Sequence, residues 1–169
     1  MVINGHSLLH AAPIKNMLGT KEKGHGVSHG LSEVGYDIRI KQKVSFLGGD
    51  NRVFGVWVQQ PPARGGSFEP GRFTLASAIE EFDMPDDLCG IVHDKSTWAR
   101  QGLSVFNTVI EPGWKGFLTL ELVYHGQNDL IIPAGAGIAQ VIFHRIANRA
   151  NYRGKYQNQA DEPVPSEFS

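Results

Sequence analysis

Short apolar runs, separated by turns rich in glycine and proline, are the feature that most restricts how this 169-residue chain can fold. The run from Tyr36 to Ile40 alternates apolar and polar residues, which is typical of a strand with one buried face. Similar short runs recur at 52–58, 72–76, 88–92, 117–124, 129–132 and 138–144. Only residues 95–101 have a convincing helical pattern. We therefore predict a mostly β protein, a sandwich or a barrel, with one short helix.

The chain is long enough for one domain with a core of its own and too short for two comfortable domains. Residues 16–32 and 59–70 are rich in glycine or proline and are expected to form mobile loops. The segment 160–169 contains prolines and acidic residues. We assign the β domain to residues 1–159 and expect 160–169 to be a flexible tail.

Charge and cysteine content exclude several classes of function. A formal net charge of −1 gives no general attraction to nucleic acids or membranes, so neither is an expected partner. The sequence has no apolar leader and no apolar run of roughly 18 residues, which predicts a soluble cytoplasmic protein. Cys89 is the only cysteine, so no internal disulfide and no Cys-x-x-Cys metal site can form. His25 and His29 lack an obvious third partner, and no protein-bound metal is predicted.

The segment 94–103 gathers a cation and two hydroxyls at the expected start of the short helix. Lys95, Ser96 and Thr97, together with exposed backbone N–H groups, could bind a phosphate group. The same hydroxyls could instead cap the helix, an effect of about 1 kcal/mol. Arg100 follows Ser96 by four residues and therefore shares its helix face. On these residues alone, a phosphate site and an ordinary capped, solvated helix remain alternatives.

Glu121 lies in the predicted strand 117–124, where alternation places it on the same face as Thr119 and Val123. A carboxylate in a partly apolar cleft has a raised pKa, because its charged form is disfavoured there. Such a group can exchange protons near neutral pH and can act as a general acid and base. The alternative is a solvated position on an edge strand.

Several segments of the chain occur in the order and spacing of a known enzyme family. They are Gly35-Tyr36-Asp37-Ile38-Arg39, Asp94 to Leu103, Ile110 to Gly116, Leu120-Glu121, Ile138-Ala139-Gln140 and Tyr152 to Gln159. The chain resembles the dCTP deaminase branch of the trimeric dUTPase superfamily, whose signature reads approximately G-R-S-S-x-A-R-x-G-L, I-D-P-G-W-x-G and L-E. The resemblance implies a single-domain distorted jelly-roll or β-barrel of the dUTPase-like type. It also implies a homotrimer with active sites at the subunit interfaces.

The resemblance further implies roles for individual residues. Glu121 would shuttle protons, with Ser96 and Arg100 as its catalytic partners. The predicted substrate-binding residues are Lys95, Ser96, Thr97, Asn107, Glu111, Gln140, Tyr152, Lys155 and Gln159. Residues 152–159 would form a C-terminal lid, with Lys155 on phosphate. Mg²⁺ would enter with the deoxynucleoside triphosphate, and zinc would not be used, because the zinc-dependent deaminases need a C-x-x-C element.

Three positions differ from the family pattern. Lys95 stands in place of an arginine, Glu111 in place of an aspartate, and 106–108 in place of Thr-Ala-His. The last of these borders the base in the family, so the base preference stays open. We expect zinc-independent hydrolytic deamination of dCTP, or of a modified-base dCTP, to dUTP and ammonia in pyrimidine deoxynucleotide metabolism. The alternatives are a dUTPase, a bifunctional enzyme giving dUMP and pyrophosphate, and a non-catalytic nucleotide-binding regulatory homologue.

Overall fold

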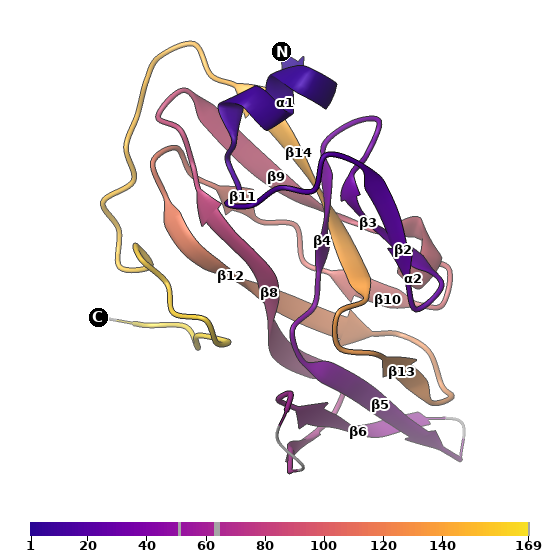
Figure 1. The fold of residues 1–169 in the computed structure, drawn as a ribbon. Helices are drawn as coiled ribbons and strands as arrows, with labels where there is room; N and C mark the ends of the chain where they lie inside the picture. The colour runs from indigo at the N-terminus through magenta and orange to yellow at the C-terminus, as the bar shows by residue number, and fades with distance from the viewer. Residues whose placement is uncertain (51, 63–64, 169) are drawn as a thin grey trace.

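The computed structural model describes residues 1–50, 52–62 and 65–168 and consists mainly of strands in three sheets (Figure 1). The largest sheet contains β1 (Val2–Ile3), β2 (Lys21–Gly24), β3 (Val27–Leu31), β4 (Tyr36–Arg39), β9 (Leu88–Asp94), β11 (Val109–Ile110) and β14 (Gly137–Arg145). Their order is β11-β9-β14-β4-β3-β2, and β1 pairs with β14 beside this path.

Two smaller sheets complete the architecture. One contains β8 (Phe73–Asp83), β10 (Leu103–Val105) and β12 (Lys115–Tyr124), in the order β10-β12-β8. The other contains β5 (Lys43–Gly49), β6 (Arg52–Gln59), β7 (Ser67–Pro70) and β13 (Leu130–Ile132), in the order β13-β5-β6-β7. The sheets stay open and do not close into a barrel. The predicted mostly β fold is therefore confirmed as packed antiparallel sheets.

The predicted strands are all confirmed, as β4, β6, β8, β9, β12, β13 and β14. β8 runs further than the sequence pattern indicates, to Asp83. The largest fully buried side chains are those of Tyr36, Phe46, Phe82 and Phe143. Burial of a large apolar side chain contributes about 1.5–3 kcal/mol to stability, so these residues hold the sheets together.

Two short helices lie outside the sheets. The predicted helix in 95–101 is confirmed as α2 (Ser96–Ala99), a single turn. A second helix, α1 (Gly5–Ala11), is absent from the predicted elements. Its signals in sequence are weak, because only Leu8 is buried and no side chain caps the helix at Asn4. Neither helix in the described part of the chain is long and apolar enough to cross a membrane.

The segment 16–32 is predicted as a loop, and that prediction is wrong. β2 and β3 form a hairpin joined by His25 and Gly26, whose φ angles of 54° and 76° are both positive. Such a two-residue turn has the twist that antiparallel strands need, and glycine adopts it without strain. In the predicted loop 59–70, β7 is a strand, and residues 63–64 lie outside the described part of the chain.

β12 positions the site because it is the central strand of its sheet, with β10 on one edge and β8 on the other. Leu120 and Leu122 point into the core, where they are 1% and 0% exposed. Thr119 and Glu121 alternate with them and line a cavity on the opposite face. The period of the strand therefore separates the core residues from the candidate functional residues.

Candidate active site

A cavity of about 400 Å³ lies between β12, β8, β11 and the C-terminal segment 151–168. Its wall includes Leu75, Thr108, Glu111, Thr119, Glu121, Tyr152, Tyr156 and Gln159. We call it the Glu121 cavity. Among the described residues that line it, Glu121 and Glu111 are the two carboxylates, and none is a lysine, arginine or histidine. The cavity thus combines apolar walls with uncompensated acidic groups.

Glu121 is held in a fully paired strand. Its register partner on β8 is Leu75, and its backbone carbonyl accepts a hydrogen bond of 3.0 Å from the N–H of Phe106. The solvated-edge alternative therefore does not apply. Burial raises the pKa of the Glu121 carboxyl above its usual range, and a hydrogen bond from its own backbone N–H opposes this in part. The raised pKa expected from the sequence is confirmed in direction, and it suits a group that exchanges protons near neutral pH.

Glu111 enters the cavity from the turn 111–114, which the sequence predicts. The N–H of Trp114 donates to the Glu111 carbonyl at 3.2 Å, and Gly113 has a φ of 71°, a conformation that favours glycine. The Trp114 indole is 5% exposed and its Nε1–H donates to the Tyr156 carbonyl at 2.6 Å. The turn therefore presents a carboxylate to the cavity and fastens the C-terminal segment at the same time.

The C-terminal segment runs beside the start of β12, as the yellow trace in Figure 1 shows. Gly116 and Gln159 form a parallel bridge, and the Phe117 N–H donates to the Gln159 carbonyl at 3.1 Å. A Cβ at Gly116 would lie 2.5 Å from the Gln159 nitrogen, so this approach needs a glycine. The Tyr152 N–H also donates to the Pro112 carbonyl at 2.8 Å. These contacts bring Tyr152 and Gln159, both predicted binding residues, into the cavity wall.

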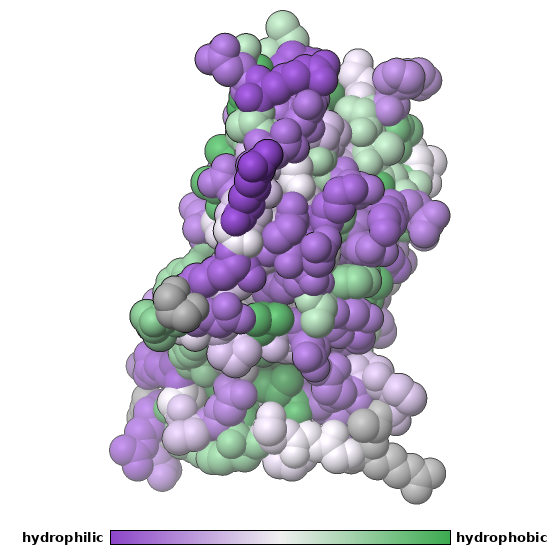
Figure 2. Space-filling view, turned by 90° about the vertical axis from the view of Figure 1, so that its left-hand side faces the viewer, coloured by the Kyte–Doolittle hydropathy of each residue, from purple (hydrophilic) through white to green (hydrophobic). Residues whose placement is uncertain are grey.

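The tail after residue 159 also contributes to the wall of the cavity. Val164, Pro165 and Ser166 line it, and the Val164 N–H donates to Thr119 Oγ1 at 3.0 Å. Farther along, the Glu167 N–H donates to the Tyr156 hydroxyl at 3.0 Å. The face that carries this segment is predominantly hydrophilic, with smaller apolar areas scattered over it (Figure 2). The division into β domain, lid and flexible tail stays a prediction.

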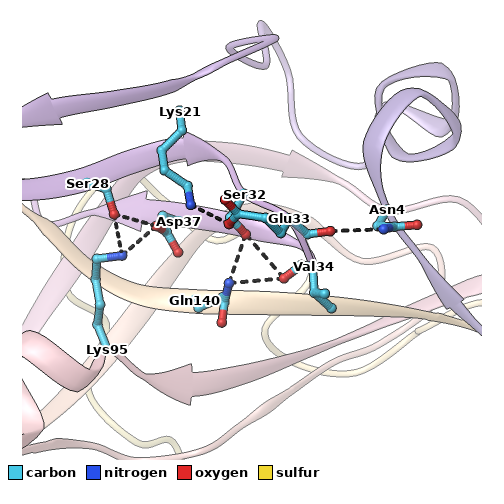
Figure 3. A network of polar contacts seen from close by, with 9 residues as sticks. All are labelled: Asn4, Lys21, Ser28, Ser32, Glu33, Val34, Asp37, Lys95 and Gln140. Carbon is cyan, nitrogen blue, oxygen red and sulfur yellow. Dashed lines mark hydrogen bonds and ion pairs between the residues drawn. The ribbon is translucent and has the colours of Figure 1, made fainter.

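A second polar group surrounds Lys95. Its ammonium group forms an ion pair with Asp37 on β4 and donates a hydrogen bond to Ser28 Oγ at 3.0 Å (Figure 3). The Ser28 hydroxyl in turn donates to the same Asp37 oxygen at 3.0 Å. The Lys95 and Asp37 side chains are only 11% and 4% exposed, and Asp37 Oδ1 is buried without a hydrogen-bond partner. We call these three residues the Lys95 cluster.

Gln140 lies next to this cluster on β14, opposite Asp37 in the strand register. Its amide nitrogen donates to Ser32 Oγ at 2.8 Å and to the Val34 carbonyl at 3.0 Å, as Figure 3 shows. The amide therefore holds the turn between β3 and β4. This accounts for a polar side chain within the apolar run 138–143, because its donors are satisfied.

The remaining predicted residues of this region lie on the surface. Ser96, Thr97 and Arg100 are exposed on or beside α2, and no side chain caps that helix. Asp94 accepts a hydrogen bond of 2.7 Å from the N–H of Val105 at the end of β10. The predicted capping of this helix by a side chain is therefore not observed, and phosphate binding stays a prediction.

The structure brings only some of the predicted site residues into the wall of the Glu121 cavity. Glu111, Glu121, Tyr152 and Gln159 line the Glu121 cavity. The others lie outside its wall: Lys95, Ser96, Thr97, Arg100, Asn107, Gln140 and Lys155. Their catalytic and binding roles stay predictions.

Two of the residues outside the wall lie close to the cavity. Asn107 is exposed beside the lining residue Thr108, and Lys155 is exposed with its ammonium 5.3 Å from the centre of the Tyr156 ring. Sequence reasoning missed Thr119, Tyr156 and Val164 as site residues. Thr119 had a signal, since alternation puts it on the same face as Glu121, and Tyr156 lies within the predicted lid 152–159; Val164 had none.

Solved structures with a similar fold are dUTPases. The native dUTPase of EIAV has a TM-score of 0.50 at 16% identity and covers 86% of this chain and 92% of its own. A dUTPase from Staphylococcus bacteriophage 80alpha has a TM-score of 0.51 at 13% identity, with 92% and 95% covered. A mutant dUTPase from phage phi11 of S. aureus, which carries a structural Mg(II) ion, has a TM-score of 0.52 at 13% identity. At these identities the likeness shows the dUTPase-like fold alone.

Sequence comparison is more specific. A dCTP deaminase of Roseiflexus castenholzii is 33% identical over 167 residues, which cover 90% of this chain and 89% of that protein. A dCTP deaminase of Campylobacter jejuni is 35% identical over 151 residues, covering 82% and 81%. The profile of the family described as dCTP deaminase-like matches residues 25–146, which include both β12 and the Lys95 cluster. The chain therefore belongs to the dCTP deaminase-like family.

Proposed function

We propose that this chain is a hydrolase that converts dCTP to dUTP and ammonia. The observation that carries the proposal is the Glu121 carboxyl, whose pKa burial raises, in the wall of a cavity of about 400 Å³. A cavity of this size is within the range of small-molecule sites. Membership of the dCTP deaminase-like family supports the choice of reaction.

In the proposed reaction, Glu121 acts as the general base and the general acid. The ionised carboxylate takes one proton as water attacks C4 of the cytosine and passes it to N3. It then takes the second proton from the hydroxyl group on C4 and passes it to the amino group. The C4–N bond then breaks, ammonia leaves, and C4 becomes the carbonyl carbon of uracil. A raised pKa lowers the free-energy cost of protonating the carboxylate relative to an ordinary glutamate, which favours its use as both acid and base. Ser96 and Arg100 would position the water and the developing oxyanion.

A triphosphate needs positive charge that the Glu121 cavity does not contain. Its described wall carries Glu111 and Glu121 and no cation. Lys95 and Arg100 lie elsewhere in the chain. We propose that a homotrimer brings the segment 95–100 of a neighbouring subunit to each cavity. The site is then complete only in the assembly, and sedimentation of the purified protein tests this directly.

Mg²⁺ fits this site as an ion carried by the nucleotide. Among the described residues, no group of three or more His, Cys, Asp or Glu side chains is placed to hold a metal ion. An ion held by phosphate oxygens and water needs no such group and would neutralise phosphate charge. We propose that the reaction uses no zinc, so chelation of zinc should leave turnover intact. Zinc whose removal abolishes turnover would contradict this.

A dUTPase or bifunctional activity is the second candidate, and Glu111 favours it. Glu111 lines the same cavity as Glu121 and could activate water for attack on phosphorus. Incubation with dCTP, dUTP and a modified-base dCTP distinguishes the candidates when ammonia, pyrophosphate and nucleotides are all measured. Ammonia without pyrophosphate supports deamination alone. Pyrophosphate supports the second candidate, and binding without products supports a regulatory homologue. A cytoplasmic location stays a prediction.

A further inference from the structure

Thr119 connects the strand that carries Glu121 to the C-terminal segment. Its Oγ1 accepts a hydrogen bond of 2.5 Å from Gln159 Nε2 and one of 3.0 Å from the backbone N–H of Val164. The two donors lie 40 and 45 residues away in sequence. No other hydroxyl in the described part of the chain receives bonds from two places in this segment. One side chain therefore fastens both the end of the predicted lid and the start of the tail.

The hydrogen-bonding capacity of a hydroxyl group limits which further hydrogen bonds Thr119 can form. A threonine hydroxyl has two acceptor lone pairs and one O–H donor. Both acceptor positions are occupied when the segment is docked, so the remaining O–H can only donate. The side chain is 7% exposed and lines the cavity on the same face as Glu121. A buried donor needs an acceptor, and the open direction for this one is the cavity interior.

We infer that Thr119 is a latch that couples docking of the C-terminal segment to the state of the cavity. With the segment docked, Gln159 and Val164 fix the hydroxyl so that its proton is directed to an acceptor in the cavity, either water or the pyrimidine edge of a substrate. With the segment released, the hydroxyl can rotate and the donor is lost. Thr119 is thus a positioning residue, and its effect on turnover rests on the proposed function.

The first test measures docking and needs no catalytic activity. Thr119→Val keeps the shape of the side chain but removes both acceptor lone pairs, whereas Thr119→Ser keeps them. Val164 lies between Pro163 and Pro165, which have no N–H, so its amide can be followed singly by hydrogen exchange. We expect exchange at Val164 to rise at least about fivefold in Thr119→Val, the scale of one net hydrogen bond, and to stay near wild type in Thr119→Ser.

Thr74→Val is the matched control. Thr74 is a fully buried threonine on the adjacent strand β8, and its hydroxyl bonds only weakly, at 3.4 Å, to the Leu75 carbonyl. The control should leave Val164 exchange unchanged. If Thr119→Val also leaves it unchanged while the protein stays folded, the latch is refuted. If Thr119→Val fails to fold, the serine variant decides, because faster Val164 exchange in a hydroxyl-bearing variant also refutes it.

The second test measures turnover of dCTP. We expect Thr119→Val to lower kcat at least about fivefold with a smaller change in KM, because the donor acts on the bound substrate. Thr119→Ser should restore kcat to near wild type. An unchanged kcat in a Thr119→Val protein whose tail is released would refute the coupling. If the wild-type protein does not deaminate dCTP, the proposed function fails, while the exchange experiment still decides the latch.

Discussion

The Glu121 cavity and the Lys95 cluster each contain a carboxylate that is at least partly buried, but only the carboxylate of the Lys95 cluster is paired with a cation. In the Lys95 cluster a buried carboxylate is paired with an ammonium group, and Ser28 bonds to both. In the Glu121 cavity two carboxylates share a wall with no cation among its described residues. In the Lys95 cluster the buried ammonium group and the buried carboxylate neutralise each other. The Glu121 cavity leaves an acid whose protonation can change, which chemistry requires.

The comparison also indicates why the two places are separate in one chain. Lys95 is paired with Asp37 and does not line the cavity, and burial raises the pKa of Glu121. If a neighbouring subunit brings its segment 95–100 to the cavity, positive charge arrives together with the assembly. The predictions below test this contrast between a proton-exchanging site and a paired one.

The largest effect is expected from Glu121→Gln. The amide keeps the shape but cannot take or return a proton, so turnover should fall about 10²- to 10⁴-fold with nucleotide binding retained. Steady-state kinetics and equilibrium binding check this. Glu81→Gln is the matched control, because Glu81 lies on the adjacent strand β8, is 38% exposed and pairs with Lys15 at 2.6 Å. Near-normal turnover in a folded Glu121→Gln protein would remove Glu121 from the mechanism.

The next largest effect is a loss of stability in Lys95→Met. The substitution leaves the buried Asp37 carboxylate without its partner, which typically costs about 3–5 kcal/mol. Urea unfolding measures the change, and the double variant Lys95→Met with Asp37→Leu should recover part of it. Glu121→Gln should show no comparable loss. A single Lys95→Met variant as stable as wild type would mean that the ion pair does not hold this region.

A smaller effect is expected from Lys155→Ala. Lys155 is exposed beside the ring of Tyr156, and its charge should serve phosphate alone. Affinity for the triphosphate should fall roughly fivefold, the scale of one exposed ionic contact, while affinity for the nucleoside should not change. Added salt should reduce the difference. Arg153→Ala removes a neighbouring exposed charge as the control. An equal loss for nucleoside and triphosphate would assign Lys155 a structural role instead.

The smallest effect is the pH dependence of stability due to Glu121. Its folded pKa is raised above the ordinary 4.5, so the folded state holds its proton more tightly than the unfolded state. The unfolding free energy of wild type, compared with Glu121→Gln, should therefore fall as pH rises from 4.5 to the folded pKa and stay level above it. Denaturant titrations at several pH values measure this. The acid limb of kcat/KM should likewise lie above pH 4.5, since the base must be ionised.

Local sequence determined much of the fold. Short apolar runs located seven of the strands but missed β5, and alternation placed Glu121 and Thr119 on the face opposite Leu120 and Leu122. The turn 111–114 was also predictable, because Pro112 restricts φ and Gly113 permits a positive φ. These features depend on residues within a few positions of one another. The hairpin at 21–31 was not predicted, because its polar strands lack alternating apolar residues and because histidine, here His25, is less usual than glycine at a positive φ.

The sequence by itself therefore determined seven of the strand segments, which face of β12 is polar, and which family motifs are present. Only the tertiary structure decided that Lys95 pairs with Asp37, 58 residues away. It alone also decided that the Thr119 hydroxyl accepts a hydrogen bond from the Val164 N–H, 45 residues away. It also decided that Glu121 is not on an edge strand. The physical reason is the separation in sequence of the residues that determine each feature. Side-chain alternation follows from the local backbone period, whereas a partner across the fold depends on sheet order and register, which many distant contacts set together.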